Sequence, residues 1–501
     1  MLVIPNIRLL VTATIVSLGG SFHFGYQLVI TNPSQSAFIE FLSNSFVEHY
    51  RFPLFNSSLK AVWSTIVASF FIGAIFGSLS LRTIAEKVGR KRGIYISITI
   101  SIISSVCSII AFFFESFELY TISRISIGYS TALALGLSAI YLNESSPTKC
   151  RGFISMITGV TIQLGTVIGS VVAMERYLGN SQFWWILYMA ECVLFVLVTF
   201  LLPFMPESPS FLLANGDEAG ARKSVLFFHN CDCSEVEPII DEMRINLQIT
   251  SKPVALIAVW QEKNSRLGVL VGVIISFSTA FSGIAVINAF AVDLLKGVGL
   301  STTSSEIGNV ILSAVSLIAI IISTFLVDHF GRRSLLLTAN SAIVLINILI
   351  SVLMYSFDTY KVSWVGYILI SVISVFIIFF AIGPGPLCYF VTTEMVDQRS
   401  RAAAQSWASL TQMACRTVVL AIYLPMEDAV GQYFSYFILF VVPVFTSLVL
   451  LYFIMPETKN RNHIEVLEEI SKLPSMRSLL RRMRIVRTIT PDKKFEGSNT
   501  C

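Results

Sequence analysis

Acidic and basic side chains recur at one spacing in the two halves of this 501-residue chain. Glu144 precedes Arg151 by seven residues, and Glu394 precedes Arg401 by the same interval. Each pair follows a long apolar run, at the predicted end of a helix. Such groups can form ion pairs between helices that break when a molecule opens, and a matched network can bias a two-state equilibrium by a few kcal/mol. The pattern favours a gate, and charges that only set the topology of the helices are the alternative.

A second repeated motif adds two arginines to this predicted gate. The run Glu86-Lys87-Val88-Gly89-Arg90-Lys91 returns about half a chain later as Asp328-His329-Phe330-Gly331-Arg332-Arg333. Glycine lets the backbone reverse between two helices, and the basic residues hold the turn in the cytoplasm. Recurrence at matching places indicates two parallel repeats. We therefore expect an inner gate formed by Arg90, Glu144, Arg151, Arg332, Glu394 and Arg401.

An arginine also lies inside an apolar run. Arg416 follows Gln412 by four residues, so the two side chains share one helix face. An arginine within a membrane is costly and is a functional candidate by default. It could bind an anionic substrate bidentately, pair with Glu191 or Asp293, or extend outward to water.

The run Gly383-Pro384-Gly385-Pro386 lies within another apolar stretch. Proline removes backbone hydrogen bonds and glycine lets the helix bend there. Broken helices are typical of substrate sites in transporters. The run predicts a helix break beside such a site, and a purely structural kink is the alternative.

Composition points to lipid as the solvent. The chain is 54% hydrophobic, only 13% charged and carries a net charge of +4, and its mean hydropathy is +0.74. Soluble proteins carry about 25% charged residues. The eight cysteines show no metal-binding spacing, and we find no nucleotide loop or nucleophile–base arrangement. We expect no enzyme, no cofactor, no metal site and no nucleic-acid partner.

Apolar runs near the roughly 20 residues that span a bilayer predict an all-α membrane protein with twelve transmembrane helices in two six-helix bundles. The predicted division is 1–204 for the first bundle, 205–266 for a cytoplasmic loop with short amphipathic helices, 267–455 for the second bundle and 456–501 for a basic cytoplasmic tail. The expected spans are 9–31, 61–82, 93–114, 118–141, 152–175, 183–204, 267–290, 306–327, 335–356, 363–387, 402–424 and 433–455.

Basic residues follow the even-numbered spans, which predicts that these ends and both termini are cytoplasmic. The first loop must then face outward, and it carries Asn56-Ser57-Ser58, an acceptor sequence for N-glycosylation. The tail has a basic stretch from Arg477 to Arg487 that could hold anionic lipid. A merely solvated tail is the alternative.

A series of motifs along nearly the whole chain resembles the sugar porter family of the major facilitator superfamily, nearest the animal facilitative hexose transporters. The matching stretches are Gly19 to Tyr26 with Asn32-Pro33, Gly89-Arg90-Lys91, Glu144 to Gly152, Gln163-Leu164-Gly165, Pro206 to Pro209, Ser282-Gly283-Ile284, Asp328 to Arg333, Gly383 to Pro386, and Pro456 to Lys459. The resemblance implies a sugar site between two bundles and alternating access without a coupling ion.

The site residues of that family are largely replaced here. Thr279 and Ala280 stand where the family has two glutamines, Ala381 stands for a glutamate, and Arg416 stands for an asparagine. Each lost hydrogen bond is worth about 0.5–1.5 kcal/mol. The residues that we expect in the substrate site are Gln163, Thr279, Asn288, Ser316, Tyr389, Gln412 and Arg416.

We therefore expect facilitative (uniport) transport of a hexose such as glucose or fructose across the plasma membrane. Two alternatives stay open: an organic anion or polyol as the substrate, suggested by Arg416, or a sugar sensor that does not transport. Proton coupling is not supported, because His23 is the only titratable side chain in the membrane part of the first span.

Overall fold

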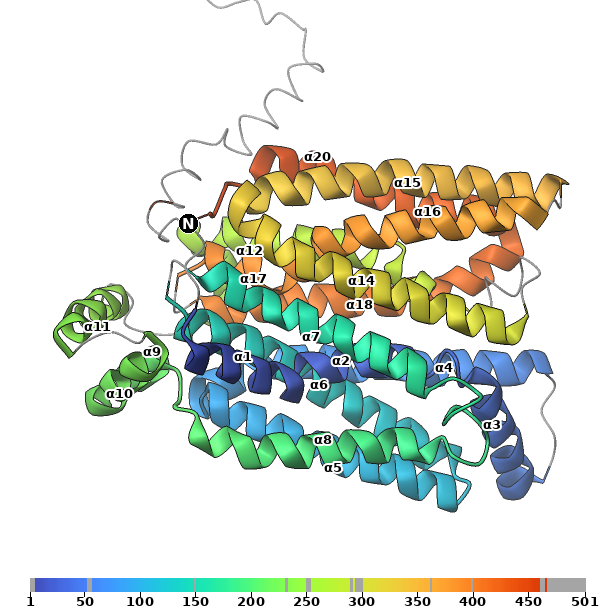
Figure 1. Cartoon of the computed structure of the whole chain (residues 1–501), viewed down its shortest axis with the longest axis horizontal. Helices are drawn as coiled ribbons and strands as arrows, with labels where there is room; N and C mark the ends of the chain where they lie inside the picture. The colour runs from blue at the N-terminus through green and yellow to red at the C-terminus, as the bar shows by residue number, and fades with distance from the viewer. Residues whose placement is uncertain are drawn as a thin grey trace, which may run out of the picture.

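The computed structural model describes residues 5–51, 56–147, 150–229, 233–248, 254–288, 292, 301–360, 363–397, 400–459 and 465. Two layers of long helices lie side by side, the blue-to-green first half against the yellow-to-red second half (Figure 1). The first layer contains α1 (Ile7–Gly19), α2 (Ser21–Val29), α4 (Asn56–Lys87), α5 (Arg90–Phe113), α6 (Phe117–Ser145), α7 (Arg151–Val172) and α8 (Trp185–Leu201).

The second layer repeats this plan. It contains α12 (Lys263–Ala280), α14 (Thr302–Phe330), α15 (Arg332–Tyr360), α16 (Ser363–Ile382), α17 (Pro384–Met395), α18 (Arg401–Val430), α19 (Gln432–Tyr436), the π-helical turn η3 (Phe437–Val441) and α20 (Val442–Ile454). The two layers meet where α4 packs on α18 and where α7 packs on α14.

Short helices cover the two ends of the molecule. The helix α3 (Gln35–Tyr50) lies at one end, and α9 (Pro209–Ala214), α10 (Glu218–His229) and α11 (Cys233–Gln248) lie at the other (Figure 1). The single turns η1 (Leu202–Phe204) and η2 (Ala258–Trp260) flank these three helices along the chain. The predicted loop 205–266 therefore consists largely of short helices at the end of the molecule opposite α3.

Nine segments of the described residues are long and apolar enough to cross a membrane. The other three predicted spans correspond to α12, to α16 with α17, and to α18. The helix α12 ends at Ala280, and Gly283 follows with a φ of 103°. The span 363–387 is divided between α16 and α17, and α18 carries several polar side chains.

Glycine allows the closest helix approaches within the first layer. A Cβ atom on Gly128 of α6 would lie 1.8 Å from the carbonyl oxygen of Phe70 in α4. A Cβ atom on Gly25 of α2 would lie 1.9 Å from the carbonyl oxygen of Ile162 in α7. Small residues that bring backbones together are the usual packing device of membrane helices, and here they fix α2 and α7 beside the interface between the layers.

Candidate functional site

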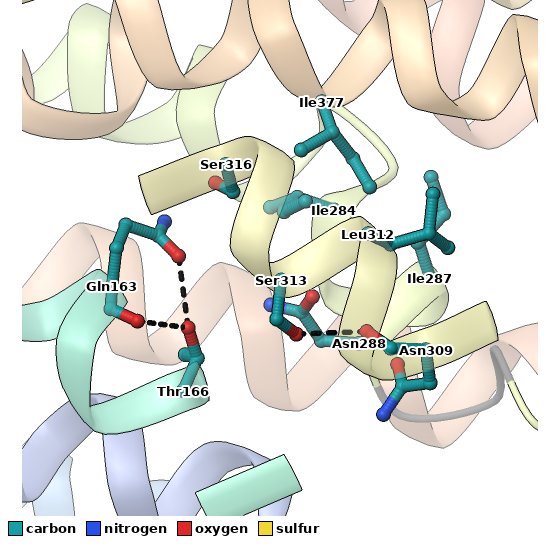
Figure 2. Close-up of a pocket in the computed structure, with 10 residues that line it drawn as sticks. All are labelled: Gln163, Thr166, Ile284, Ile287, Asn288, Asn309, Leu312, Ser313, Ser316 and Ile377. Atoms are coloured by element: carbon teal, nitrogen blue, oxygen red, sulfur yellow. Dashed lines mark hydrogen bonds between the residues drawn. The ribbon is translucent and has the colours of Figure 1, made fainter. Parts of the chain in front are cut away.

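A small cavity lies between the two layers. Gln163 and Thr166 of α7 line one side, and Asn309, Ser313 and Ser316 of α14 line another. The segment after α12 contributes Ile284, Ile287 and Asn288 (Figure 2). The cavity encloses about 20 Å³, which is room for about one water molecule. No hexose-sized molecule fits it as it stands, so binding requires the layers to move apart.

Three of the seven predicted substrate residues, Gln163, Asn288 and Ser316, line this cavity. The hydroxyl of Thr166 donates to the Gln163 side-chain oxygen at 2.9 Å and orients that amide (Figure 2). On the opposite wall, the backbone oxygen of Asn288 accepts a bond of 2.7 Å from the amide of Asn32 in the first layer. Polar groups of both layers therefore meet around the cavity.

The other predicted substrate residues gather at the helix break. Gly383 separates α16 from α17, with φ −110° and ψ −103°. Two hydroxyl groups bind carbonyl oxygens on either side of the break: Ser323 donates to Ile382 at 2.6 Å and Thr279 donates to Pro384 at 3.5 Å. Hydroxyl side chains thus bind the backbone where the helical ladder is interrupted.

Arg416 lies at the interface between the layers. Its guanidinium carbon stands 5.3 Å from the ring centroid of Phe24, which belongs to α2 of the opposite layer. Tyr389 packs edge-on against the same ring at 6.4 Å, and the side chains of Gln412 and Arg416 lie near enough to act on its hydroxyl electrostatically. The amide of Gln412 also contacts the Cys388 sulfur at 3.4 Å.

The first layer holds a buried polar network that the sequence did not predict. Glu191 shares a short hydrogen bond with Nδ1 of His23 and accepts another from Gln27 at 2.8 Å. Arg124 donates to the Gln27 side-chain oxygen at 2.6 Å. Glu191 is therefore engaged within its own layer, and Asp293, the other partner considered for Arg416, lies outside the described residues.

The inner gate predicted for the first half is a cluster at the end of the molecule that bears α9. Arg90 pairs with Glu144 at 2.9 Å, and the hydroxyl of Ser208 donates a short hydrogen bond to the same carboxylate. Glu207 accepts the backbone N–H of Lys91 at 2.9 Å. The turn, the end of α6 and the segment after α8 are thereby joined.

The second half repeats this arrangement. Arg332 pairs with Glu394 at 3.3 Å, and the hydroxyl of Thr458 donates to Glu394 at 3.0 Å. Glu457 accepts the backbone N–H groups of Arg332 at 2.8 Å and Arg333 at 3.1 Å. The sequence shows the repeated Pro-Glu-Ser and Pro-Glu-Thr runs but did not predict that their side chains would join these two charged clusters. The residues concerned are Glu207, Ser208, Glu457 and Thr458.

The two clusters act on each other across the interface. The negative charge of Glu394 acts on Arg151 of the first half, and the charge of Glu144 acts on Arg401 of the second half. Arg401 also donates to the backbone oxygen of Thr393 at 3.1 Å. All six predicted gate residues are thus in one charged network at the end that bears α9.

Comparison with known proteins gives consistent results. A family model described as "Sugar (and other) transporter" matches residues 12–470. The chain is 28% identical over 454 residues to the facilitated glucose transporter member 1 of solute carrier family 2 from Gallus gallus, covering 89% of this chain and 90% of that protein. It is 27% identical over 469 residues to member 3 from Homo sapiens, covering 91% of both.

Solved structures resemble the whole fold. The proton:xylose symporter XylE bound to 6-bromo-6-deoxy-D-glucose matches with a TM-score of 0.77 at 22% identity, covering 92% of this chain and 98% of that one. The inward open conformation of the xylose transporter XylE from E. coli matches with a TM-score of 0.68 at 21% identity, covering 93% and 99%. The expected architecture of twelve transmembrane helices in two bundles is confirmed. The chain therefore belongs to the sugar transporter family, on the major facilitator fold, and is a multi-pass membrane transporter and not an enzyme.

Proposed function

We propose that this protein carries a hexose such as glucose or fructose across the plasma membrane by facilitative uniport with alternating access. The observation that carries the proposal is the cavity between the layers, where side chains of both halves supply donors and acceptors around Gln163, Asn288 and Ser316. Sugar hydroxyls need such two-way partners. Glucose transporters related along nine-tenths of the chain support the same substrate class.

The charged network at the end that bears α9 would be the inner gate of this cycle. Its members are partly or fully buried, and Arg332 is only 4% exposed. The cavity between the layers has room for only about one water molecule in the same structure. Breaking the contacts of Arg151 and Arg401 across the interface would let the two halves separate at this end, so that the sugar leaves toward the cytoplasm.

Orientation and domain division belong to the proposal as well. We infer that both termini are cytoplasmic and that the halves divide at 204 and 267. Asn56 begins α4, at the end of the molecule that bears α3. A glycan at Asn56 would place that end outside the cell, and loss of a mobility shift on Asn56→Gln would show the glycan there. The basic tail, a candidate for anionic lipid, lies outside the described residues.

Uptake into proteoliposomes tests the substrate. Purified native protein should take up labelled glucose or fructose saturably. Gln163→Ala should raise the KM for the hexose by about 2- to 10-fold, since one neutral hydrogen bond contributes about 0.5–1.5 kcal/mol. Arg222→Asn, on the exposed face of α10, is the control and should transport as the native protein does. Absence of hexose uptake above protein-free vesicles would overturn the proposal.

A further inference from the structure

The charge of Arg416 is buried where two halves meet. The residue is 4% exposed, and its Nε has no hydrogen-bond partner within the described residues. An arginine remains protonated in proteins, and a buried charge without a counter-ion is costly. Among the ion pairs found in the described residues, none includes Arg416. The guanidinium therefore retains an unused donor at Nε and has no carboxylate partner among the described residues.

The described polar neighbours of Arg416 are uncharged. Gln412 lies one turn earlier on α18, where its amide nitrogen contacts the Cys388 sulfur at 3.4 Å, and Tyr389 lies near both side chains. The buried carboxylate of Glu191 is taken by His23 and Gln27 in the opposite layer. A neutral sugar needs acceptors as well as donors, whereas a carboxylate accepts at both oxygens and matches the fork of a guanidinium.

An aromatic ring beside Arg416 suits the apolar face of a sugar. Phe24 lies beneath the guanidinium at 5.3 Å, and Tyr389 packs edge-on against Phe24. An aromatic face is the usual partner for the C–H surface of a sugar. Because Phe24 belongs to the first half and Arg416 to the second, a molecule between the halves meets both.

We propose that Arg416 binds the carboxylate of a hexose-sized sugar acid, so that this transporter accepts hexuronates in the site where it accepts hexoses. The proposal rests on the proposed function, because it assumes that sugars pass between the two halves. Arg416 and Gln412 hold the carboxylate, and Phe24 contacts the ring. The residue thereby sets substrate specificity, whereas Gln163 serves neutral and anionic sugars alike.

The test compares labelled D-glucuronate with labelled D-glucose in proteoliposomes at one pH. The native protein should take up glucuronate saturably. Arg416→Asn should lower kcat/KM for glucuronate about 10- to 150-fold, the range for a hydrogen bond to a charged group, while glucose uptake is kept or increased. Arg416→Lys keeps the charge and should retain part of the glucuronate uptake. Gln163→Ala is the matched control and should change both substrates by a similar factor.

The outcomes separate the two proposals. If the protein takes up glucose but not glucuronate, and glucuronate does not inhibit glucose uptake, the proposed role of Arg416 is overturned and hexose transport stands. If Arg416→Asn lowers glucose uptake and glucuronate uptake equally, with an unchanged unfolding temperature, the proposed role of Arg416 is also overturned. Equal losses of uptake indicate a general rather than a selective role. Absence of uptake for both sugars by well-folded native protein overturns hexose transport and the sugar-acid proposal together.

Discussion

Replacing Glu394 by glutamine should open the inner end of the transporter. Glu394 pairs with Arg332 in its own half, and its charge attracts Arg151 across the interface. Arg332 repels Arg151, so removing the carboxylate leaves only the repulsion between these two guanidinium groups. The attraction between Glu394 and Arg151 weakens when the halves separate, whereas the pair of Glu394 and Arg332 lies within one half and persists.

The size of the shift follows from that attraction. Among the described residues no hydrogen bond or ion pair joins Glu394 to Arg151, so the two charges act over a longer distance and their attraction contributes about 1 kcal/mol. Since 1.36 kcal/mol corresponds to a factor of ten, loss of this attraction should raise the ratio of open to closed molecules by about 5-fold. Glu457→Gln is the matched control, because Glu457 binds the backbone of Arg332 and Arg333 within one half.

Electron–electron double resonance can measure this opening. Arg92 and Ser334 are exposed and occupy equivalent positions in the first turns of α5 and α15, so a spin label on each reports the separation of the halves. The labels would be placed in a background without the eight native cysteines. A longer distance should become populated in Glu394→Gln. An unchanged distribution, or the same lengthening in Glu457→Gln, would refute the gate mechanism.

Three further predictions concern stability. Glu191→Gln should lower the unfolding temperature, because it removes a buried carboxylate whose hydrogen bonds contribute about 1.5–3 kcal/mol each; an unchanged temperature in a thermal-shift assay would contradict this. Gly128→Ala should cost about 1–3 kcal/mol by forcing α6 away from Phe70 of α4, seen as a lower unfolding temperature and a faster loss of monodisperse protein. Burial and the nearby charge of Arg151 lower the pKa of His229 to about 4. The unfolded chain then binds the extra proton first, so stability should fall as pH drops from about 6.5 toward 4. His229→Gln should flatten that part of the pH profile of the unfolding temperature.

The sequence predicted the spans because hydropathy depends on local composition. It predicted the break at Gly383 because proline removes a donor from the helix wherever it stands. The breaks at Gly20 and Gly283 were missed. Each lies inside an apolar run, and an isolated glycine is compatible with an unbroken helix. Only the packing shows that these positions require glycine. A Cβ atom on Gly20, for example, would lie 2.6 Å from the Ser138 hydroxyl.

The site was predictable in part for a similar reason. Thr166 follows Gln163 by three residues, and Asn309 and Ser313 precede Ser316 at helical spacing, so helical periodicity could have found these lining residues. The partners of buried groups could not be found that way. His23 and Glu191 are 168 residues apart, and their pairing depends on how α2 and α8 pack in the bundle.

A time course of labelled hexose uptake, with and without an imposed proton gradient, tests the central claim most directly. Uniport predicts saturable uptake that stops at equal internal and external concentrations and is unaffected by the gradient. Accumulation above the external concentration, driven by an acidic exterior, would contradict uniport, and no uptake at all would contradict hexose transport.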